Sequence, residues 1–356
     1  MASAGRLRVG ILFGGRSAEH EVSVISAQGV MAAIDAQRFQ AVPLGVTKQG
    51  AWLTPQQTQA AIDAIRGERM GALDDPHGGS FGTQVLAALQ QVDVVFPLVH
   101  GTYGEDGSLQ GLLEMAGIPY VGAGVTASAL GMDKSLQQMV FRQAGLPIPD
   151  SLTVTWRQWK EEATAVARQV EATLEYPCFV KPANSGSSIG TSKARSREDL
   201  ADSLAEAFRH DRKALVEQAI EGRQIECSVL GNDDPQASPL GEIVFVREFY
   251  DYVAKYDDPN TRLIIPADLP SPLAEKMQIL AIAAFKAIDC AGMGRVDFFL
   301  TQDGQPYVNE INTIPGFTPM SMYPKLWEAA GLSYHDLITR LVELALERHQ
   351  EKQRRA

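Results

Sequence analysis

The sequence predicts a mixed fold of the α/β and α+β classes, divided into domains at 1–122, 123–217 and 218–356. In the first third, apolar strand-like runs alternate with helical segments and end in glycine-rich turns, which is typical of a parallel α/β domain. Later strand-like runs follow one another with a strong hairpin signal, which indicates antiparallel pairing. A length of 356 residues also favours two or three domains.

The first part of the chain is expected to form a parallel sheet. Its predicted elements are a strand at 7–13, a helix through about 34, strands at 41–47 and 92–101, a helix from about Ser108, and the segment 118–124. Residues 54–82 are polar and glycine-rich, so we expect a surface excursion. Ligands of parallel sheets bind beyond the carboxyl ends of the strands. The stretches "GGRSAEHE" (14–21) and "HGTYGEDG" (100–107) should therefore meet at one edge.

The remaining elements resemble a small α+β unit followed by a larger one. We expect a helix from Asp133 to Ala144, strands at 151–156, 176–182 and 213–220, helices at 157–173 and 197–209, strands at 224–231 and 239–245, a polar loop at 248–268, a helix at 272–289, a hairpin at 294–312 and two closing helices.

The composition is that of an ordinary globular protein, with a net charge of −11 and a pI of about 5.1. This acidity argues against a nucleic-acid-binding surface. Cys178, Cys227 and Cys290 lie far apart in apolar runs, which favours buried thiols in a reducing compartment over disulfides or zinc. No run suits a signal peptide or a membrane span. We expect a cytoplasmic protein with no membrane partner.

A carboxylate and an amide stand out in the apolar run "PYVNEIN" (306–312). If Asp303-Gly304 forms a two-residue turn, Asp297 lies opposite Glu310 and Arg295 lies opposite Asn312, all on one face. Facing carboxylates about 5 Å apart repel each other. The pattern is best explained by a bound hard cation such as Mg²⁺, although an exposed face with solvated charges stays as the alternative.

Two stretches are suited to a nucleotide. "CFVKPANSGSSIGTS" (178–192) places Lys181 at a strand end before a Ser/Gly loop that can wrap phosphate oxygens, or that is only a flexible surface loop. The chain has no GxxxxGK[ST] motif. "VEQAI" (216–220) resembles an exposed strand edge that could read adenine, with Glu217 accepting from its amino group. An ordinary strand explains it equally well.

Three further features carry weaker signals. "GAGVTA" (122–127) partly matches a dinucleotide motif, without the acidic residue expected about twenty positions later. The segment 248–256 can form a water-excluding lid from Tyr250, Tyr252, Lys255 and Tyr256, or simply cover a core edge. Glu21 could bind an ammonium, with assistance from His100.

Seven stretches occur together in order: "GGRSAEHEVSVISA", "HGTYGEDGSLQGLLE", "MDKS", "FVKPANSGSSIG", "YDYVAKY", "GRVDFF" and "NEINTIPGFTPMS". With them the chain closely resembles the D-alanine–D-alanine ligases of the ATP-grasp superfamily over essentially its whole length. The resemblance implies an ATP-grasp fold behind an N-terminal pre-ATP-grasp domain. It also implies ATP-dependent peptidoglycan precursor synthesis, two Mg²⁺ ions that Mn²⁺ can replace, D-alanine as substrate and a homodimer.

The resemblance also implies roles for individual residues. The implied metal ligands are Asp297, Glu310 and Asn312. The implied ATP-binding residues are Lys134, Lys181, Ser188, Glu217, Gln218, Ala219, Ile220, Gln224, Tyr250 and Phe299. Glu21 and His100 match the site of the first D-alanine, and Arg295 and the Gly316 N–H match the oxyanion pair. Ser187, Lys255, Tyr256, Ser321 and Met322 match the set that orders the second D-alanine and the closing loop.

Two departures from the family pattern are visible. Gln224 stands where relatives often have a ribose-binding Glu, so we expect altered nucleotide affinity. Met322 replaces a common leucine at nearly the same volume.

Several alternatives to a D-alanine ligase are open. Ligases that use D-lactate or D-serine are one, although Tyr256 favours D-alanine over D-lactate. Another ATP-grasp carboxylate–amine ligase is disfavoured by "HEVS" together with "YDYVAKY". A nicotinamide-dependent oxidoreductase built on "GAGVTA" comes from a different class. A non-catalytic nucleotide-binding module is the weakest alternative.

Overall fold

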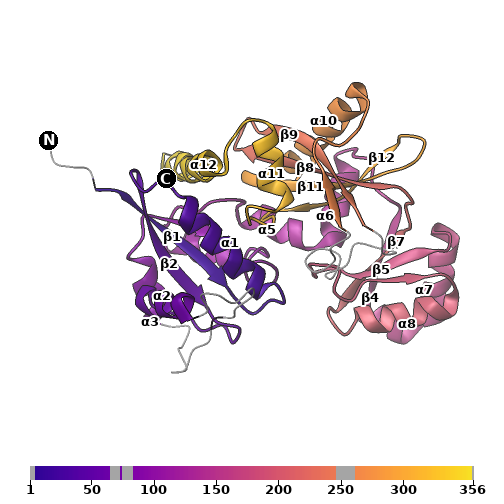
Figure 1. Cartoon of the computed structure of the whole chain (residues 1–356). Helices are drawn as coiled ribbons and strands as arrows, with labels where there is room; N and C mark the ends of the chain where they lie inside the picture. The colour runs from indigo at the N-terminus through magenta and orange to yellow at the C-terminus, as the bar shows by residue number, and fades with distance from the viewer. Residues whose placement is uncertain (1–4, 65–72, 74–82, 246–260, 355–356) are drawn as a thin grey trace.

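The computed structural model describes residues 5–64, 73, 83–245 and 261–354 (Figure 1). The strands are β1 Leu7–Gly14, β2 Phe39–Val46, β3 Val94–Pro97, β4 Ser151–Thr155, β5 Cys178–Pro182, β6 Ser192–Ala194, β7 Lys213–Gln218, β8 Arg223–Gly231, β9 Gln236–Val244, β10 Arg262–Ile264, β11 Gly292–Leu300 and β12 Pro306–Asn312. The helices are α1 His20–Ala33, α2 Pro55–Ala64, α3 Thr83–Leu89, α4 Ser108–Met115, α5 Val125–Met132, α6 Lys134–Gln143, α7 Trp156–Thr173, α8 Arg197–Ala207, α10 Ser271–Ala287, α11 Met322–Ala329 and α12 Tyr334–Gln353. Within these described ranges, every helix is too short or too polar to cross a lipid bilayer.

The first sheet is parallel, with the strand order β2-β1-β3. Strand β1 is buried along most of its length because it lies between two neighbours and is covered by helices. Its carboxyl end and that of β3 lie at the same edge, as predicted, so the loops 14–19 and 98–107 are neighbours. A left-handed φ of 93° at Gly14 and a hydrogen bond from the Gly14 N–H to Ser23 Oγ (2.8 Å) turn the chain into α1.

The two other sheets are antiparallel and lie side by side (Figure 1). One has four strands in the order β4-β7-β5-β6 and packs on α7 and α8. The other has five strands in the order β10-β9-β8-β11-β12 and packs on α10. The chain passes from one sheet to the other between β7 and β8. Residues at this junction therefore face both sheets.

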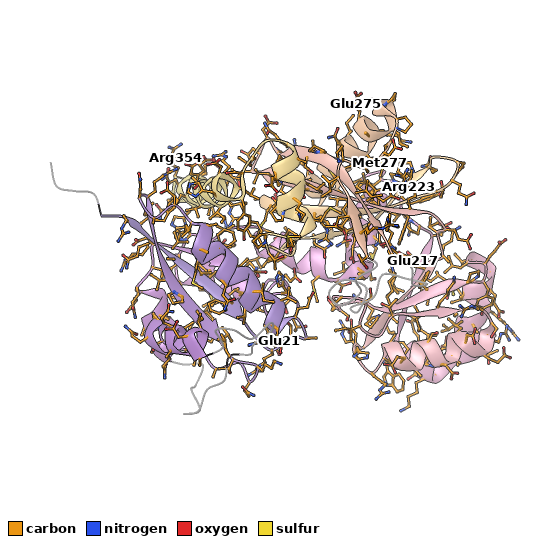
Figure 2. All side chains as sticks on the ribbon, viewed as in Figure 1. Glu21, Glu217, Arg223, Glu275, Met277 and Arg354 are labelled. Carbon is orange, nitrogen blue, oxygen red and sulfur yellow. The ribbon has the colours of Figure 1, made fainter. Side chains whose placement is uncertain are left out.

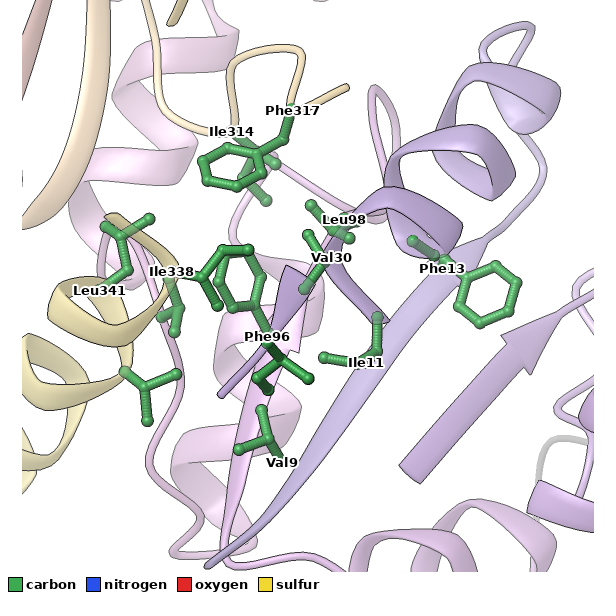
Figure 3. Packing of buried hydrophobic residues seen from close by; sticks show 14 of the residues in the cluster. Val9, Ile11, Phe13, Val30, Phe96, Leu98, Ile314, Phe317, Ile338 and Leu341 are labelled. Atoms are coloured by element: carbon green, nitrogen blue, oxygen red, sulfur yellow. The ribbon is translucent and has the colours of Figure 1, made fainter. Parts of the chain in front are cut away.

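The hydrophobic cores join segments that are far apart in the sequence. In the core shown in Figure 3, Ile338 and Leu341 of α12 pack with Ile11 and Phe96 of the parallel sheet, and Phe317 lies edge-on to Phe96 with ring centroids 5.4 Å apart. A second core joins α5 and α6 to the five-stranded sheet and to α10. Both the start and the end of the described chain thus contribute to one core.

The structure differs from the predicted elements in a few places. Helices α2, α3 and α5 were not predicted, and residues 118–124 form an isolated bridge from Tyr120 to Val95 instead of a regular strand. Helix α2 buries only Thr58 and Ile62, so its sequence is mostly polar and lacks the apolar pattern that predicts a helix. Helix α5 is short, contains a glycine and has no pronounced apolar stripe.

Candidate active site

The hairpin of β11 and β12 places its polar residues in the predicted register, although its loop and its strand pairing near the loop differ from the prediction. Arg295 pairs with Asn312 and Asp297 with Glu310, but nearer the loop Phe298 pairs with Val308 and Leu300 with Pro306. The predicted two-residue turn is wrong. The loop residues lie between Thr301 and Gln305, with the Gly304 N–H donating to Thr301 O (3.0 Å) and Gly304 at a φ of 82°.

The one-residue difference made by this longer loop is cancelled by a β-bulge. The register shifts between Asp297 and Phe298, so the partner strand has an extra residue at Asn309. A bulge bends its strand and redirects side chains. Here it turns Asn309 and Glu310 toward the same cavity.

The predicted face is formed by charged groups that contact one another. Arg295 donates to Asp297 through Nε (2.7 Å to Oδ1) and Nη2 (2.8 Å to Oδ2). Asn312 Nδ2 donates to Asp297 Oδ2 (3.0 Å), and Lys134 Nζ lies 3.0 Å from Glu310 Oε2. Burial opposes the charge of Lys134, but the attraction of Glu310 raises its pKa overall. The carboxylates of this site are therefore paired with the positively charged side chains of Arg295 and Lys134.

The oxygen atoms of this face suit a hard divalent cation. They are two carboxylates and one amide, which are preferred ligand types for Mg²⁺. Because Asn312 donates through Nδ2, its Oδ1 is the atom suited to a cation. In the described part of the chain, no group of three or more His, Cys, Asp or Glu side chains is arranged to hold a metal. This face thus supplies a partial ligand set that a triphosphate can complete.

A cavity of about 350 Å³ lies between the two antiparallel sheets. One wall comes from β5, β7 and the Ser/Gly loop, and the other comes from β8, β11 and β12. Predicted nucleotide and metal residues line it together: Lys181, Ser188, Glu217, Gln218, Ala219, Ile220, Gln224, Phe299, Asp297 and Glu310. Gln224 is the direct strand partner of Phe299. The predicted ribose and base contacts therefore lie beside each other.

The predicted adenine edge needs correction. Strand β7 is an inner strand, paired with β4 and β5 up to Gln218, so its backbone is not an exposed edge. Only Ala219 and Ile220, which follow the strand, offer backbone groups outside the sheet. The Glu217 carboxylate is 1% exposed, pairs with Lys181 (2.6 Å) and accepts from Gln138, at the place where the two sheets meet (Figure 2).

The Ser/Gly loop has a backbone shape suited to anions. Ser187, Ser188 and Gly190 have φ values of 49°, 57° and 71°, and successive turns form from Ile189 N to Gly186 O and from Thr191 N to Ser188 O, each 3.1 Å. Turns of this kind can point successive backbone N–H groups into a concave surface. Lys134 Nζ donates to Ser185 O (2.9 Å), which ties this loop to the carboxylate face.

Two glutamates near the start of α1 have different surroundings. Glu21, the predicted residue, pairs with Lys48 on the N-terminal unit, and this partner lowers its pKa although burial acts to raise it. Glu19, which was not predicted as a site residue, accepts a hydrogen bond from Ser187 Oγ. The structure therefore brings Glu19 to the Ser/Gly loop and leaves Glu21 outside it.

His100 and Glu105 extend the site from the loop after β3. His100 is 4% exposed, its Nδ1 lies 3.1 Å from Ile314 O, and its Nε2 has no hydrogen-bond partner among the described residues. Burial lowers the pKa of His100. Burial, aided by Glu19, raises the pKa of Glu105 to about 8, and Glu105 also accepts from the Gly101 N–H (2.8 Å). A neutral imidazole with a buried, unpartnered nitrogen is a ready contact for a substrate.

The loop before α11 holds the remaining predicted residues. Ser321 Oγ accepts from the Thr318 N–H (3.0 Å), and a Cβ added to Gly316 would lie 3.2 Å from that oxygen. Met322 packs in an apolar cluster with Ile243 and Leu326, so its side chain does not face the polar cavity. Tyr250, Tyr252, Lys255 and Tyr256 lie outside the described residues, and their roles stay predictions.

Two antiparallel sheets with lysines, carboxylates and a loop suited to anions between them define an ATP-grasp protein. The family model described as "D-ala D-ala ligase N-terminus" matches residues 8–123, and "D-ala D-ala ligase C-terminus" matches residues 140–343. The chain belongs to the D-alanine–D-alanine ligase family.

Individual relatives agree with this family. The chain is 48% identical over 355 residues to a D-alanine–D-alanine ligase of Geobacillus thermodenitrificans, covering 98% of each chain. Among solved structures, it is similar to the D-alanine–D-alanine ligase from Coxiella burnetii, with a TM-score of 0.81, 37% identity and coverage of 99% and 97%. It is also similar to the VanG D-Ala:D-Ser ligase from Enterococcus faecalis, with a TM-score of 0.81, 33% identity and coverage of 96% and 100%.

Proposed function

We propose that the protein joins two D-alanine molecules in an ATP-dependent reaction that supplies peptidoglycan synthesis. One observation carries this proposal: a single cavity is lined by Lys181, Ser188, Asp297 and Glu310, which combine phosphate-binding and metal-binding chemistry. Membership of the family, at 48% identity over nearly the whole chain, supports the same reaction.

The nucleotide would lie between the two antiparallel sheets. Phe299 would pack on the base, and the backbone of Ala219 and Ile220 would read its edge. Gln224 would accept one ribose hydroxyl. Lys181 and the N–H groups around Ser188 would hold the phosphates, with Lys134 between the Ser/Gly loop and Glu310.

Mg²⁺ fits the donor set of this face, and Asp297, Glu310 and Asn312 would hold it together with ATP oxygens. Two ions held there would offset negative charge on the transferring phosphoryl group. The side chains that now pair with these oxygens are Arg295 and Lys134. Their positive charges offset the repulsion between the neighbouring carboxylates when no metal ion is bound.

The protein would activate the first D-alanine by orienting it. Glu19 would hold the ammonium of this D-alanine and His100 would contact the substrate through Nε2. The carboxylate of the D-alanine would attack the terminal phosphate of ATP, so that ADP leaves and an acyl phosphate forms. Arg295 and the Gly316 N–H would then receive the negative charge that develops when the amine of the second D-alanine attacks, before phosphate leaves and the amine loses a proton. Each such donor contributes about 3 kcal/mol in comparable sites. Ser187, Ser321, Lys255 and Tyr256 would order the second D-alanine, with the backbone N–H of Met322.

ATP-dependent phosphate release with D-alanine as the only amino acid tests the reaction directly. We expect one phosphate and one dipeptide per ATP, identified by mass spectrometry. Substituting L-alanine should abolish turnover. Dipeptide formation that does not require ATP would refute the proposal.

The choice of second substrate needs a separate measurement, because one similar structure is a D-Ala:D-Ser ligase. Equal concentrations of D-alanine, D-serine and D-lactate should give mainly the D-alanine product. A dominant D-serine product would assign the alternative. Thermal stabilisation by Mg²⁺–ATP, compared with NAD(H) or NADP(H), separates the ligase from the oxidoreductase alternative.

We further infer three domains at 1–122, 123–217 and 218–356, a cytoplasmic location and a homodimer. The change of sheet between β7 and β8 supports the second boundary. Cys178, Cys227 and Cys290 are free and buried, which suits a reducing compartment. Analytical ultracentrifugation tests the dimer, because a purely monomeric species at working concentration would exclude it.

A further inference from the structure

Glu226 is a third carboxylate beside the proposed metal ligands. It lies on β8 directly opposite Asp297, which in turn lies opposite Glu310 on β12. Three carboxylates therefore stand in a row across neighbouring strands, on the face that also carries Arg295. Like charges at such spacing are destabilising unless a cation lies between them.

Arg295 is that cation for two of the three carboxylates. Its Nε lies 2.7 Å from Asp297 Oδ1 and 3.0 Å from Glu226 Oε2, while its Nη2 lies 2.8 Å from Asp297 Oδ2. The side chains of Arg295 and Glu226 are only 13% and 6% exposed. The Nε–H is directed at Asp297, so the contact with Glu226 is an electrostatic one.

The proposed function gives Asp297 two competing tasks. In the structure, both oxygens of Asp297 accept hydrogen bonds from Arg295, and Oδ2 also accepts one from Asn312. A metal ion bound to Asp297 would draw electron density from the carboxylate and weaken its hydrogen bonds to Arg295. If Asp297 alone held Arg295, metal binding would loosen the group that receives the oxyanion.

We propose that Glu226 is a positioning residue that retains Arg295 when Asp297 binds the metal. Glu226 needs no large movement, because its oxygen is already 3.0 Å from Nε and its strand is fixed between β9 and β11. The guanidinium would shift its hydrogen bonds from Asp297 to Glu226 and stay beside the acyl group. This inference rests on the proposed function of Arg295.

A double-mutant cycle between Glu226 and Arg295 tests the proposal. Glu226→Gln keeps the shape and removes the charge, and Arg295→Met removes the group on which Glu226 acts. We expect E226Q to lower kcat about tenfold or more when Arg295 is present, with KM for ATP nearly unchanged at saturating Mg²⁺. In the R295M background the same change should alter kcat less than about twofold. An equal loss in both backgrounds would overturn the proposal.

Metal binding gives a readout that does not depend on turnover. Mn²⁺ binding in the presence of a non-hydrolysable ATP analogue can be followed by electron paramagnetic resonance. We expect E226Q to weaken Mn²⁺ binding several-fold, because Arg295 then stays on Asp297, and to have no effect in R295M. Weakening in both backgrounds would instead mean that Glu226 acts on the metal directly.

Glu242 offers a matched control on the same sheet. It is buried on β9 and paired with Arg223 through both oxygens (2.8 and 2.6 Å), outside the cavity lining. E242Q should keep kcat and Mn²⁺ binding while lowering the melting temperature as much as E226Q does. If E226Q changes only the melting temperature, its role is structural and the proposal fails.

The cycle also separates this inference from the function on which it rests. Wild-type protein that makes no dipeptide would refute the proposed function. Active wild-type protein with a silent E226Q would refute only the role of Glu226.

Discussion

Glu19 and Glu21 make a matched pair for testing which carboxylate binds the first D-alanine. Both lie near the start of α1, but Glu19 contacts Ser187 of the Ser/Gly loop and Glu21 pairs with Lys48. A charge-assisted hydrogen bond to an ammonium is worth about 1.5–3 kcal/mol. Glu19→Gln should therefore lower kcat/KM for the first D-alanine about 10- to 150-fold.

The same arithmetic gives a much smaller effect for Glu21→Gln. Its partner Lys48 is 45% exposed, and such exposed pairs are worth less than about 1 kcal/mol. We expect kcat/KM to fall less than about fivefold. Neither change should alter KM for ATP by more than about twofold, because both residues lie outside the cavity between the antiparallel sheets.

The assay is ADP release against D-alanine concentration, fitted to two binding steps, with melting temperatures to verify folding. If E21Q loses as much as E19Q or more, the assignment of Glu19 is wrong and the prediction from the sequence is restored.

Three further predictions follow from the site, the buried Glu105 and the shared core. Asp297→Asn should raise the Mg²⁺ concentration for half-maximal rate at least about tenfold, whereas Asp303→Asn in the hairpin loop should not, and identical titrations would exclude the metal site. Glu105 has a pKa near 8 in the fold against 4.5 ordinarily, so the fold keeps a proton that the unfolded chain loses as pH rises through this window. The melting temperature of Glu105→Gln minus that of the wild type should therefore rise from pH 5 to 8 and stay constant above pH 8. A difference that does not depend on pH would contradict the raised pKa of Glu105. Leu341→Ala, at a fully buried position of α12, should lower the free energy of unfolding by about 2–5 kcal/mol in urea, and a loss below about 1 kcal/mol would argue against the shared core.

The sequence predicts much of the fold because most strands carry clear periodic or apolar runs. Strands β1 and β2, the strands of the hairpin and the helices α6, α7, α8 and α10 were predicted close to their observed bounds, whereas the strand predicted at 92–101 is observed only at Val94–Pro97. The packing of α12 on the first sheet was not predicted, since an amphipathic pattern shows that a helix buries a face without showing against what.

The site shows why register arguments from sequence are fragile. The predicted pairing of Asp297 with Glu310 is confirmed, but the assumed two-residue turn is wrong and the bulge at Asn309 compensates for it. A bulge has little sequence signal, because any residue can occupy the extra position. The predicted register is correct because the one-residue offset from the longer loop and the one-residue offset from the bulge cancel.

The choice between Glu19 and Glu21 could not be made from spacing alone. Glu19 precedes α1 and is its N-cap residue, whereas Glu21 lies in the first turn of the helix, so the two side chains leave the backbone in different directions. Helix ends are the least certain feature of a sequence-based assignment, so this difference could not be predicted. The observed start of α1 at His20 shows it.

The shared core of α12 and the parallel sheet has a consequence for synthesis on the ribosome. Ile11 and Phe96 are synthesised long before Ile338 and Leu341. Part of the apolar face of the nascent N-terminal sheet therefore stays exposed until α12 has been synthesised. A chain stalled before α12 would present that face to other nascent chains or chaperones. Ribosome-bound intermediates of increasing length should become protease-resistant in this region only after α12 has left the exit tunnel.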